Sequence, residues 1–169
     1  HGYDLLIANA DNDDILEDHY LRYFMGTQMS GVMVQPMASP DWRPTMAKMP
    51  VPIVHLDTHC SEPGYYVAAD NEAQGRIIAE LAIARGARHI TVVGRAAFMQ
   101  LTLRVLGIHK ALALHPDIKI EVIDAGEWNT AADGYSIGAQ IAERSTDERP
   151  DFVIGLTDVL ASGVISALT

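Results

Sequence analysis

Polar side chains follow most of the strand-like runs in this sequence. Ligands of open parallel sheets bind beyond the carboxyl ends of the strands, so these are the positions where a binding site forms. The residues there are Asn9, Asp11, Asn12, Gln35, Asp57, Arg95, Gln100, Glu127, Trp128, Thr157 and Asp158. Carboxylate, carboxamide, hydroxyl and guanidinium groups hydrogen-bond hydroxyls, and an indole ring can stack on a sugar. The set predicts non-covalent binding of a small polar molecule.

Each strong candidate also has a purely structural interpretation, which the sequence leaves open. Asp57 can cap a loop, and Gln35 can bond a neighbouring loop. Trp128 can cover a hydrophobic edge, and Arg104, inside a predicted helix, can be a solvated or ion-paired arginine. Asp158 falls in a first helical turn, where a carboxylate suits the helix dipole without any function. No single residue identifies a ligand.

The sequence gives little support to catalysis or to a metal centre. It contains no G-x-x-x-x-G-K-[ST] phosphate loop and no G-x-G-x-x-G dinucleotide fingerprint. His55, His59 and Cys60 are too few for structural zinc, which needs four ligands. We therefore expect a protein that is not an enzyme and that uses neither a cofactor nor a metal.

Short apolar runs alternate with helical patterns along most of the chain. The runs lie at residues 3–8, 31–35, 52–56, 65–69, 89–93, 118–123 and 152–156. Helical patterns cover residues 15–25, 71–85, 99–114 and 130–144, and a last one begins at 158 with Thr157 as its cap. This alternation predicts an α/β protein whose parallel sheets are covered by helices on both faces.

Residues 70–94 predict one helix followed by one strand. We expect Asn71 to be the N-cap, with Gln74 placed to reach back to it, and Gly86 to end the helix. The predicted buried stripe consists of Ile77, Ile78, Leu81 and Ala82. A loop at residues 58–66 breaks the rhythm of strands and helices. The predicted lobe boundary therefore lies near residue 70, between residues 1–70 and 71–169.

Composition limits the partners and the compartment. The 169 residues are 49% hydrophobic and carry a formal net charge of -10, so the chain itself should repel the phosphates of DNA or RNA. One cysteine, Cys60, excludes an internal disulfide and favours a reducing compartment. No apolar run reaches the length of a membrane span. The chain opens in a strand-like run and stops in a helical pattern, so we expect it to be truncated at both ends.

Six segments occur in a characteristic order and spacing. They are residues 2–9, 30–36 and 51–57, the motifs Asp70-Asn71-x-x-x-Gly75 and Arg104-x-x-Gly107, and residues 156–163. Together they resemble the LacI/GalR family of transcriptional regulators and the related periplasmic sugar-binding proteins. The resemblance implies two Rossmann-like lobes with parallel sheets flanked by helices, the type I periplasmic-binding-protein-like fold.

The resemblance also implies a ligand site shared by the two lobes. Its residues would be Gln35 and Asp57 on the first lobe and Phe98, Gln100, Arg104, Trp128, Thr157 and Asp158 on the second. Arg104 looks like the family arginine that fixes hydroxyls or a carboxylate of the effector. Thr157 stands where the family usually has Asn, which alters or removes one amide contact.

Three functions remain open. The first is the effector-binding core of a cytoplasmic, dimeric transcriptional repressor. Its effector would be a sugar or a nucleoside, and it would reach operator DNA only through a headpiece absent from this chain. The alternative is the substrate-binding protein of a sugar ABC transporter. An α/β enzyme is the third. Arg88-His89-Ile90 and the Arg104-x-x-Gly107 motif resemble regulators somewhat more than transport proteins.

Overall fold

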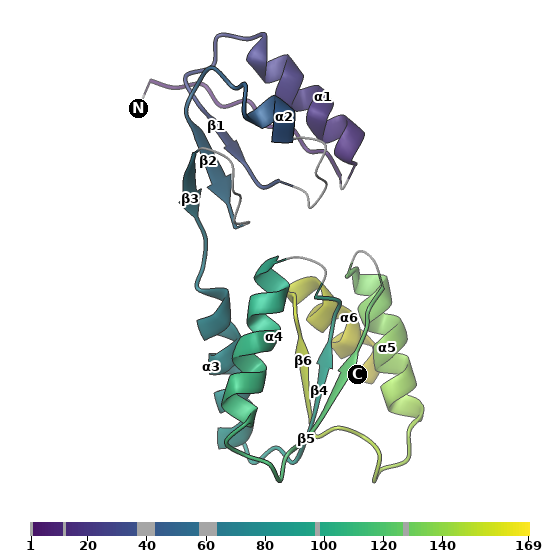
Figure 1. The fold of residues 1–169 in the computed structure, drawn as a ribbon. Coiled ribbons are helices and arrows are strands. Elements are labelled where there is room, and N and C mark those ends of the chain that lie inside the picture. Colours follow the sequence, from purple (N-terminus) through teal and green to yellow (C-terminus); the bar gives the residue numbers. More distant parts are fainter. Residues whose placement is uncertain (1, 12, 37–42, 58–63, 97–98, 127–128) are drawn as a thin grey trace. The chain divides into compact units, whose positions relative to one another are not determined.

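Every strand pairing that the structure describes is parallel. The computed structural model describes residues 2–11, 13–36, 43–57, 64–96, 99–126 and 129–169. The chain forms two compact α/β units, His1–Ala69 and Asp70–Thr169, each with its own three-stranded sheet (Figure 1). The α/β class with parallel sheets flanked by helices, predicted from the alternation of elements, is confirmed.

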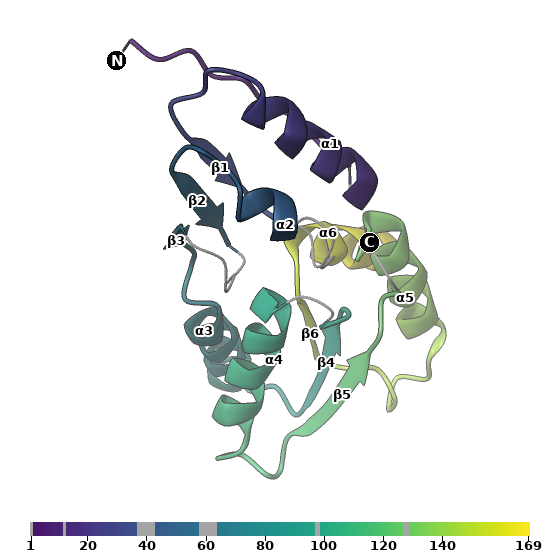
Figure 2. The same cartoon turned by 45° about the horizontal axis from the view of Figure 1, so that its top comes forward.

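The second unit is a sheet between two pairs of helices. Its strands β4 (His89–Val93), β5 (Lys119–Ile123) and β6 (Phe152–Gly155) stand in the order β5-β4-β6. Helices α3 (Asn71–Ala84) and α4 (Met99–Leu112) cover one face, and α5 (Ala131–Glu143) and α6 (Asp158–Leu168) cover the other (Figures 1 and 2).

The central strand β4 supplies side chains to a separate core on each face of the sheet. Ile90 and Val92 pack with residues of α3 and α4, whereas Val93 packs with residues of α5 and α6. All three side chains are buried, as period-2 alternation requires of a strand covered on both sides. Because helices shield both faces, the carboxyl edge of this sheet is where polar side chains can gather.

Local capping explains most of the helix ends. Thr130 and Asp133 form a capping box at the start of α5, and Thr157 caps α6 as predicted. At the end of α3, Gly86 has φ 82 and donates to Ile83, while the Ala87 amide donates to Ala82. This pair of bonds is a Schellman motif, so Gly86 does end α3.

The predicted cap at the start of α3 is wrong by one residue. Asp70 is the N-cap, and its side chain accepts a hydrogen bond from the Ala73 amide. Asn71 is instead the first helical residue and is only 2% exposed. Asp and Asn can both cap a helix, but here the Asn71 side chain lies inside the fold, where it accepts a hydrogen bond from Arg104.

The first unit contains helix α1 (Asp14–Met25), strand β1 (Val32–Val34), helix α2 (Arg43–Met46), and strands β2 (Ile53–Leu56) and β3 (Tyr65–Val67). Its sheet has the order β1-β2-β3. Asp13 caps α1, and the core of the unit is built on Leu21, Met46 and Ile53. Helix α2 was not predicted from the sequence.

The strand expected at residues 3–8 is not present. These residues have no regular secondary structure, and Tyr3, Leu5 and Ile7 are 82%, 75% and 79% exposed. An alternating apolar pattern makes a strand only where a neighbouring strand completes the hydrogen bonds, and β1 pairs with β2 alone among the described strands. Of the helices described, none has both the length and the apolar character needed to cross a bilayer.

Candidate functional site

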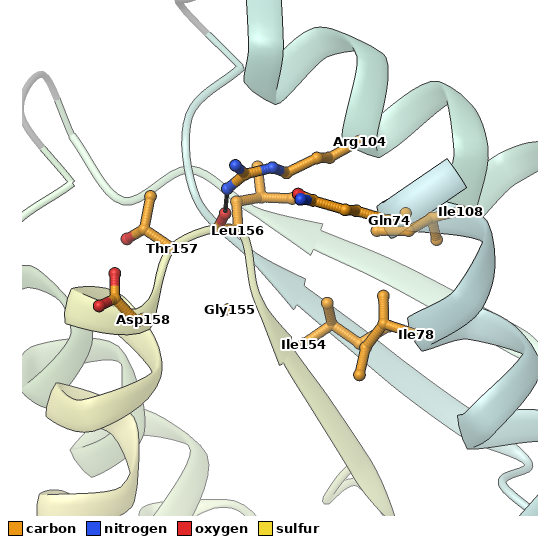
Figure 3. Close-up of a pocket in the computed structure, with 10 residues that line it drawn as sticks. Gln74, Ile78, Arg104, Ile108, Ile154, Gly155, Leu156, Thr157 and Asp158 are labelled. Atoms are coloured by element: carbon orange, nitrogen blue, oxygen red, sulfur yellow. Dashed lines mark hydrogen bonds between the residues drawn. The ribbon is translucent and has the colours of Figure 1, made fainter. Parts of the chain in front are cut away.

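A pocket of about 210 Å³ lies in the second unit at the carboxyl end of β6 (Figure 3). Helices α3 and α4 and the first turn of α6 form its walls. Its apolar lining comes from Ile78, Ile108, Ile154 and Leu156, and its polar lining from Gln74, Arg104, Thr157 and Asp158. A few polar groups around an apolar floor are typical of small-molecule sites.

Arg104 is held in this pocket by two neutral oxygen atoms. Its Nε donates to Asn71 Oδ1 at 2.9 Å, and Nη1 donates to the Leu156 carbonyl oxygen at 2.6 Å. Figure 3 draws the second of these bonds, between Arg104 and Leu156. The side chain is half-buried, and its guanidinium projects from α4 toward the end of β6.

No described carboxylate forms an ion pair with Arg104. A guanidinium has five N–H donors, so the two bonds leave donors for a further acceptor. A half-buried cation with neutral partners gains from a strong acceptor, such as a ligand hydroxyl or an anionic oxygen.

Thr157 and Asp158 reach the same pocket from the start of α6. The Thr157 hydroxyl oxygen accepts from the Leu160 amide at 3.2 Å, so part of its role is to cap the helix. Asp158 is exposed, and Figure 3 draws its carboxylate beside Thr157, on the α6 side of the pocket. A ligand that both accepts and donates hydrogen bonds suits a site with Arg104 and Asp158 among its walls.

Asn129 ties together the loops that follow β4 and β5. Its Oδ1 accepts from the Arg95 amide at 2.7 Å, and its Nδ2 donates to the Arg95 carbonyl oxygen at 3.3 Å. Asn129 is 6% exposed and has φ 53, a left-handed conformation that asparagine tolerates better than most residues. This two-point contact joins Arg95, two residues after β4, to the residue before the N-cap of α5.

Of the remaining predicted site residues, Gln100 is the second residue of α4. Phe98 and Trp128 lie outside the described residues. The Gln100 side chain places Oε1 in the interior, and this oxygen has no hydrogen bond to any described group. Gln100 does not line the pocket of Arg104.

Gln35 and Asp57 lie together at the carboxyl edge of the first sheet. They directly follow β1 and β2, whose register places Val34 opposite His55. Gln35 is exposed, and Asp57 is half-buried with φ 56. The Asp57 amide donates to the Val67 carbonyl oxygen at 2.9 Å, which joins this edge to β3.

The structure thus brings Arg104, Thr157 and Asp158 into one pocket. Sequence reasoning missed Gln74 as a pocket residue and Asn71 as the partner of Arg104. Both belong to the Asp70-Asn71-x-x-x-Gly75 motif, so that motif carried a usable signal. Asn129 was also missed, although an Asn directly before a capping box could have indicated a left-handed residue.

One pKa shift outside the pocket belongs to an ion pair between Glu121 and Arg144. Arg144 donates two hydrogen bonds to Glu121, at 2.7 and 3.0 Å, and thereby lowers the pKa of that carboxyl. A hydrogen bond from Thr91 lowers the Glu121 pKa further, while burial opposes the shift. Glu121 lies on β5 and does not line the pocket of Arg104.

A G-x-S-x-G sequence occurs within α5. Residues 134–138 read Gly-Tyr-Ser-Ile-Gly, the G-x-S-x-G spacing of a nucleophile elbow. An elbow requires a sharp turn from a strand into a helix, whereas these residues lie inside α5. Ser136 therefore does not occupy the position of an activated nucleophile. His59 and Cys60, the other groups weighed for chemistry, lie outside the described residues.

Comparisons with known proteins agree with this architecture. The chain is similar to the ribose operon repressor of Lactococcus lactis subsp. lactis (strain IL1403), with 25% identity over 92 residues, which are 54% of this chain and 27% of that protein. The chain therefore spans about a quarter of the length of that curated relative.

Solved structures share the fold at low identity. The Cra transcriptional dual regulator from Pseudomonas putida, in complex with fructose 1-phosphate, matches with a TM-score of 0.83 and 22% identity over 99% of this chain and 62% of its own. The periplasmic binding protein component of the arabinose ABC transporter from Shewanella sp. ANA-3, bound to L-arabinofuranose, matches with a TM-score of 0.81 and 20% identity over 95% of this chain and 57% of its own.

The family itself is settled by sequence. Residues 2–169 match the family described as the periplasmic binding protein domain, which is nearly the whole chain. Parallel sheets flanked by helices, with a pocket at the carboxyl end of β6, are what such a domain requires. The chain belongs to the periplasmic binding protein domain family.

Proposed function

We propose that this chain is the effector-binding core of a LacI/GalR-type transcriptional regulator that binds a sugar or nucleoside without chemical change. The observation that carries the proposal is Arg104, held by Asn71 and Leu156 with no described carboxylate paired to it. The ribose operon repressor and the Cra regulator, which resemble this chain, support a regulator, and the fructose 1-phosphate bound by Cra supports a sugar.

Several further properties belong to the same proposal. The eight predicted site residues, including Gln35 and Asp57, contact the effector. The lobes correspond to residues 1–70 and 71–169, with a hinge near residues 69–71. The complete protein works as a homodimer in the cytoplasm, catalyses no reaction, and binds operator DNA through a segment outside this chain. Its net charge of -10 supports the last point, because an acidic chain repels phosphate.

Calorimetry on the full-length protein tests effector binding. The probes are D-ribose, D-glucose, L-arabinose, fructose 1-phosphate and adenosine. Arg104→Ala should weaken the best probe by about 10- to 150-fold, since a charge-assisted hydrogen bond contributes about 1.5–3 kcal/mol. The matched control is Arg76→Ala, which removes an arginine whose side chain is 49% exposed on α3. Equal affinities in the wild type and both variants would reject Arg104 as a ligand group.

The second candidate is the substrate-binding protein of a sugar ABC transporter, favoured by the likeness to the arabinose-binding component. The two candidates differ in what the ligand changes. A regulator should show altered affinity for its operator DNA when the best probe is added, measured by gel shift over a range of salt concentrations. A transport protein should bind the same probe with no effect on DNA. Residues 1–169 alone should not retard DNA in either case.

A further inference from the structure

Helices α3 and α4 cross so closely that no side chain fits between them at two positions. A Cβ on Gly75 would lie 1.9 Å from the Arg104 carbonyl oxygen, and a Cβ on Gly107 would lie 2.0 Å from the Glu72 carbonyl oxygen. The contact is reciprocal, since each glycine meets the backbone of the opposite helix. The two helices lie side by side in both views of the fold (Figures 1 and 2).

The crossing coincides with the hydrogen bond that holds the pocket arginine. Arg104 precedes Gly107 by three residues and Asn71 precedes Gly75 by four, so each glycine lies about one helical turn from one partner of that bond. Atoms of Arg104 itself, its Cα, C and O, are the nearest to the position of a Gly75 side chain. The separation of the helix backbones therefore determines whether Arg104 Nε reaches Asn71 Oδ1 at 2.9 Å.

We propose that Gly75 and Gly107 are positioning residues for ligand recognition, because their close crossing aims the Arg104 guanidinium at the ligand. This inference rests on the proposed function of Arg104 as a ligand group. Gly107 is the sharper test of the two, because Gly75 lines the pocket and Gly107 does not. A side chain at Gly107 acts on the ligand only through the helix that carries Arg104.

The opposite face of the sheet offers a matched control. Helices α5 and α6 also meet through glycines, and a Cβ on Gly138 would lie 2.8 Å from the Ala167 Cβ and 2.9 Å from the Val164 carbonyl oxygen. These contacts lie two turns along α6 from the pocket residues Thr157 and Asp158. Gly138→Ala thus strains a helix crossing of the same unit without displacing Arg104.

The experiment measures probe affinity by calorimetry on full-length wild type, Gly107→Ala, Gly138→Ala, Arg104→Lys and the double variant Gly107→Ala with Arg104→Lys. The probe is whichever of D-ribose, D-glucose, L-arabinose, fructose 1-phosphate or adenosine binds the wild type most tightly. If Gly107→Ala unfolds in buffer, all proteins are compared in trimethylamine N-oxide, which favours the folded state. Stability is measured in parallel by urea unfolding.

Gly107→Ala should weaken the probe by about tenfold or more, the effect of losing one charge-assisted hydrogen bond, while Gly138→Ala changes affinity by less than about twofold. In the Arg104→Lys background, which lacks the Nε donor and the planar fork, Gly107→Ala should cause no further loss. The inference would be overturned if both glycine variants lost affinity in the same proportion to their loss of folding stability. It would also be overturned if Gly107→Ala weakened binding as much in the Arg104→Lys background as in the wild type.

A measurement without ligand separates this inference from the proposed function. The Arg104 Nε–H signal in NMR should exchange slowly with water in the wild type and in Gly138→Ala, and rapidly in Gly107→Ala, because the bond to Asn71 protects it. If no probe binds the wild type, the proposed function fails, and this signal still decides whether the glycines position Arg104. Unchanged protection in folded Gly107→Ala would overturn the inference.

Discussion

The Nε of Arg104 donates to Oδ1 of Asn71, which joins the middle of α4 to the first residue of α3 across 33 positions of sequence. Asn71 is 2% exposed, so its amide oxygen is a buried acceptor whose partner is a cation. Buried polar groups are costly to leave unpaired, and this bond therefore contributes to the stability of the fold.

Asn71→Ala should lower the free energy of unfolding by about 1–3 kcal/mol, because it leaves the Arg104 Nε without its acceptor. Asn71→Asp keeps an oxygen at that place and should cost less, while its charge neutralises the guanidinium. Urea unfolding of both variants measures the difference. Equal losses would indicate that the amide oxygen contributes little to the fold.

Asn129 should tolerate glycine better than alanine. Both substitutions remove the two hydrogen bonds to Arg95, but only alanine places a Cβ in a left-handed conformation, at a cost of about 1–2 kcal/mol. We expect Asn129→Ala to be less stable than Asn129→Gly by about 1 kcal/mol in urea unfolding. A more stable alanine variant would show that the loop abandons its positive φ.

Asp57→Asn should separate ligand binding from loop conformation. Asp57 has φ 56, and asparagine adopts this conformation at least as readily as aspartate. Thermal unfolding should change little, while affinity for a sugar probe falls because a carboxylate accepts hydroxyl hydrogen bonds better than an amide oxygen does. Asp57→Ala should lower both quantities. A purely structural Asp57 would instead lower the melting temperature of the asparagine variant and leave affinity intact.

Glu121 should contribute stability that depends on pH. Its pKa is lowered in the folded protein, chiefly by the hydrogen bonds from Arg144, so its contribution is complete above the ordinary carboxyl pKa of about 4.3 and disappears as pH falls through the lowered value. Glu121→Gln should be destabilising at neutral pH, by about 1 kcal/mol, and this difference should shrink as the pH falls below the ordinary carboxyl pKa.

The control for that titration is Glu80→Gln. Glu80 pairs with Arg76 at 2.8 Å, and both side chains are about half exposed, at 52% and 49%. Exposed ion pairs contribute about 0–1 kcal/mol, so this variant should follow the wild type at every pH. A constant difference between the wild type and Glu121→Gln across the pH range would contradict the role given to Glu121.

Features that depend on a few neighbouring residues could be predicted from the sequence. The capping box of Thr130 and Asp133, the cap at Thr157 and the termination of α3 at Gly86 all satisfy backbone groups within one helical turn. The alternation of short strands and long helices predicted the α/β class for the same reason. Thr157 and Asp158 could be selected because they follow a strand at the edge of a parallel sheet, whereas Arg104, in the middle of α4, was selected only through the family resemblance.

Features that depend on distant partners were decided by the tertiary structure. The predicted buried stripe of α3 included Ile77 and Leu81, which are 57% and 41% exposed, whereas Gly75 and Ala79 are buried. Small residues face inward because the backbones of α3 and α4 are too close for a side chain between them. A pattern of hydrophobic residues does not contain the distance between two helices. The strand expected at residues 3–8 likewise lacks the neighbour that would complete it.

The sequence by itself indicated candidate residues for binding a small molecule and, for those that follow strands, the edge of a sheet to which they belong, because strand polarity and side-chain chemistry are local properties. It could not determine that Arg104 would be held by Asn71 and by the Leu156 carbonyl oxygen, 33 and 52 positions away. Only the packing of α3 against α4 and of both helices against the sheet sets those distances. A hydrogen bond depends on tenths of an ångström, which no spacing in a sequence encodes.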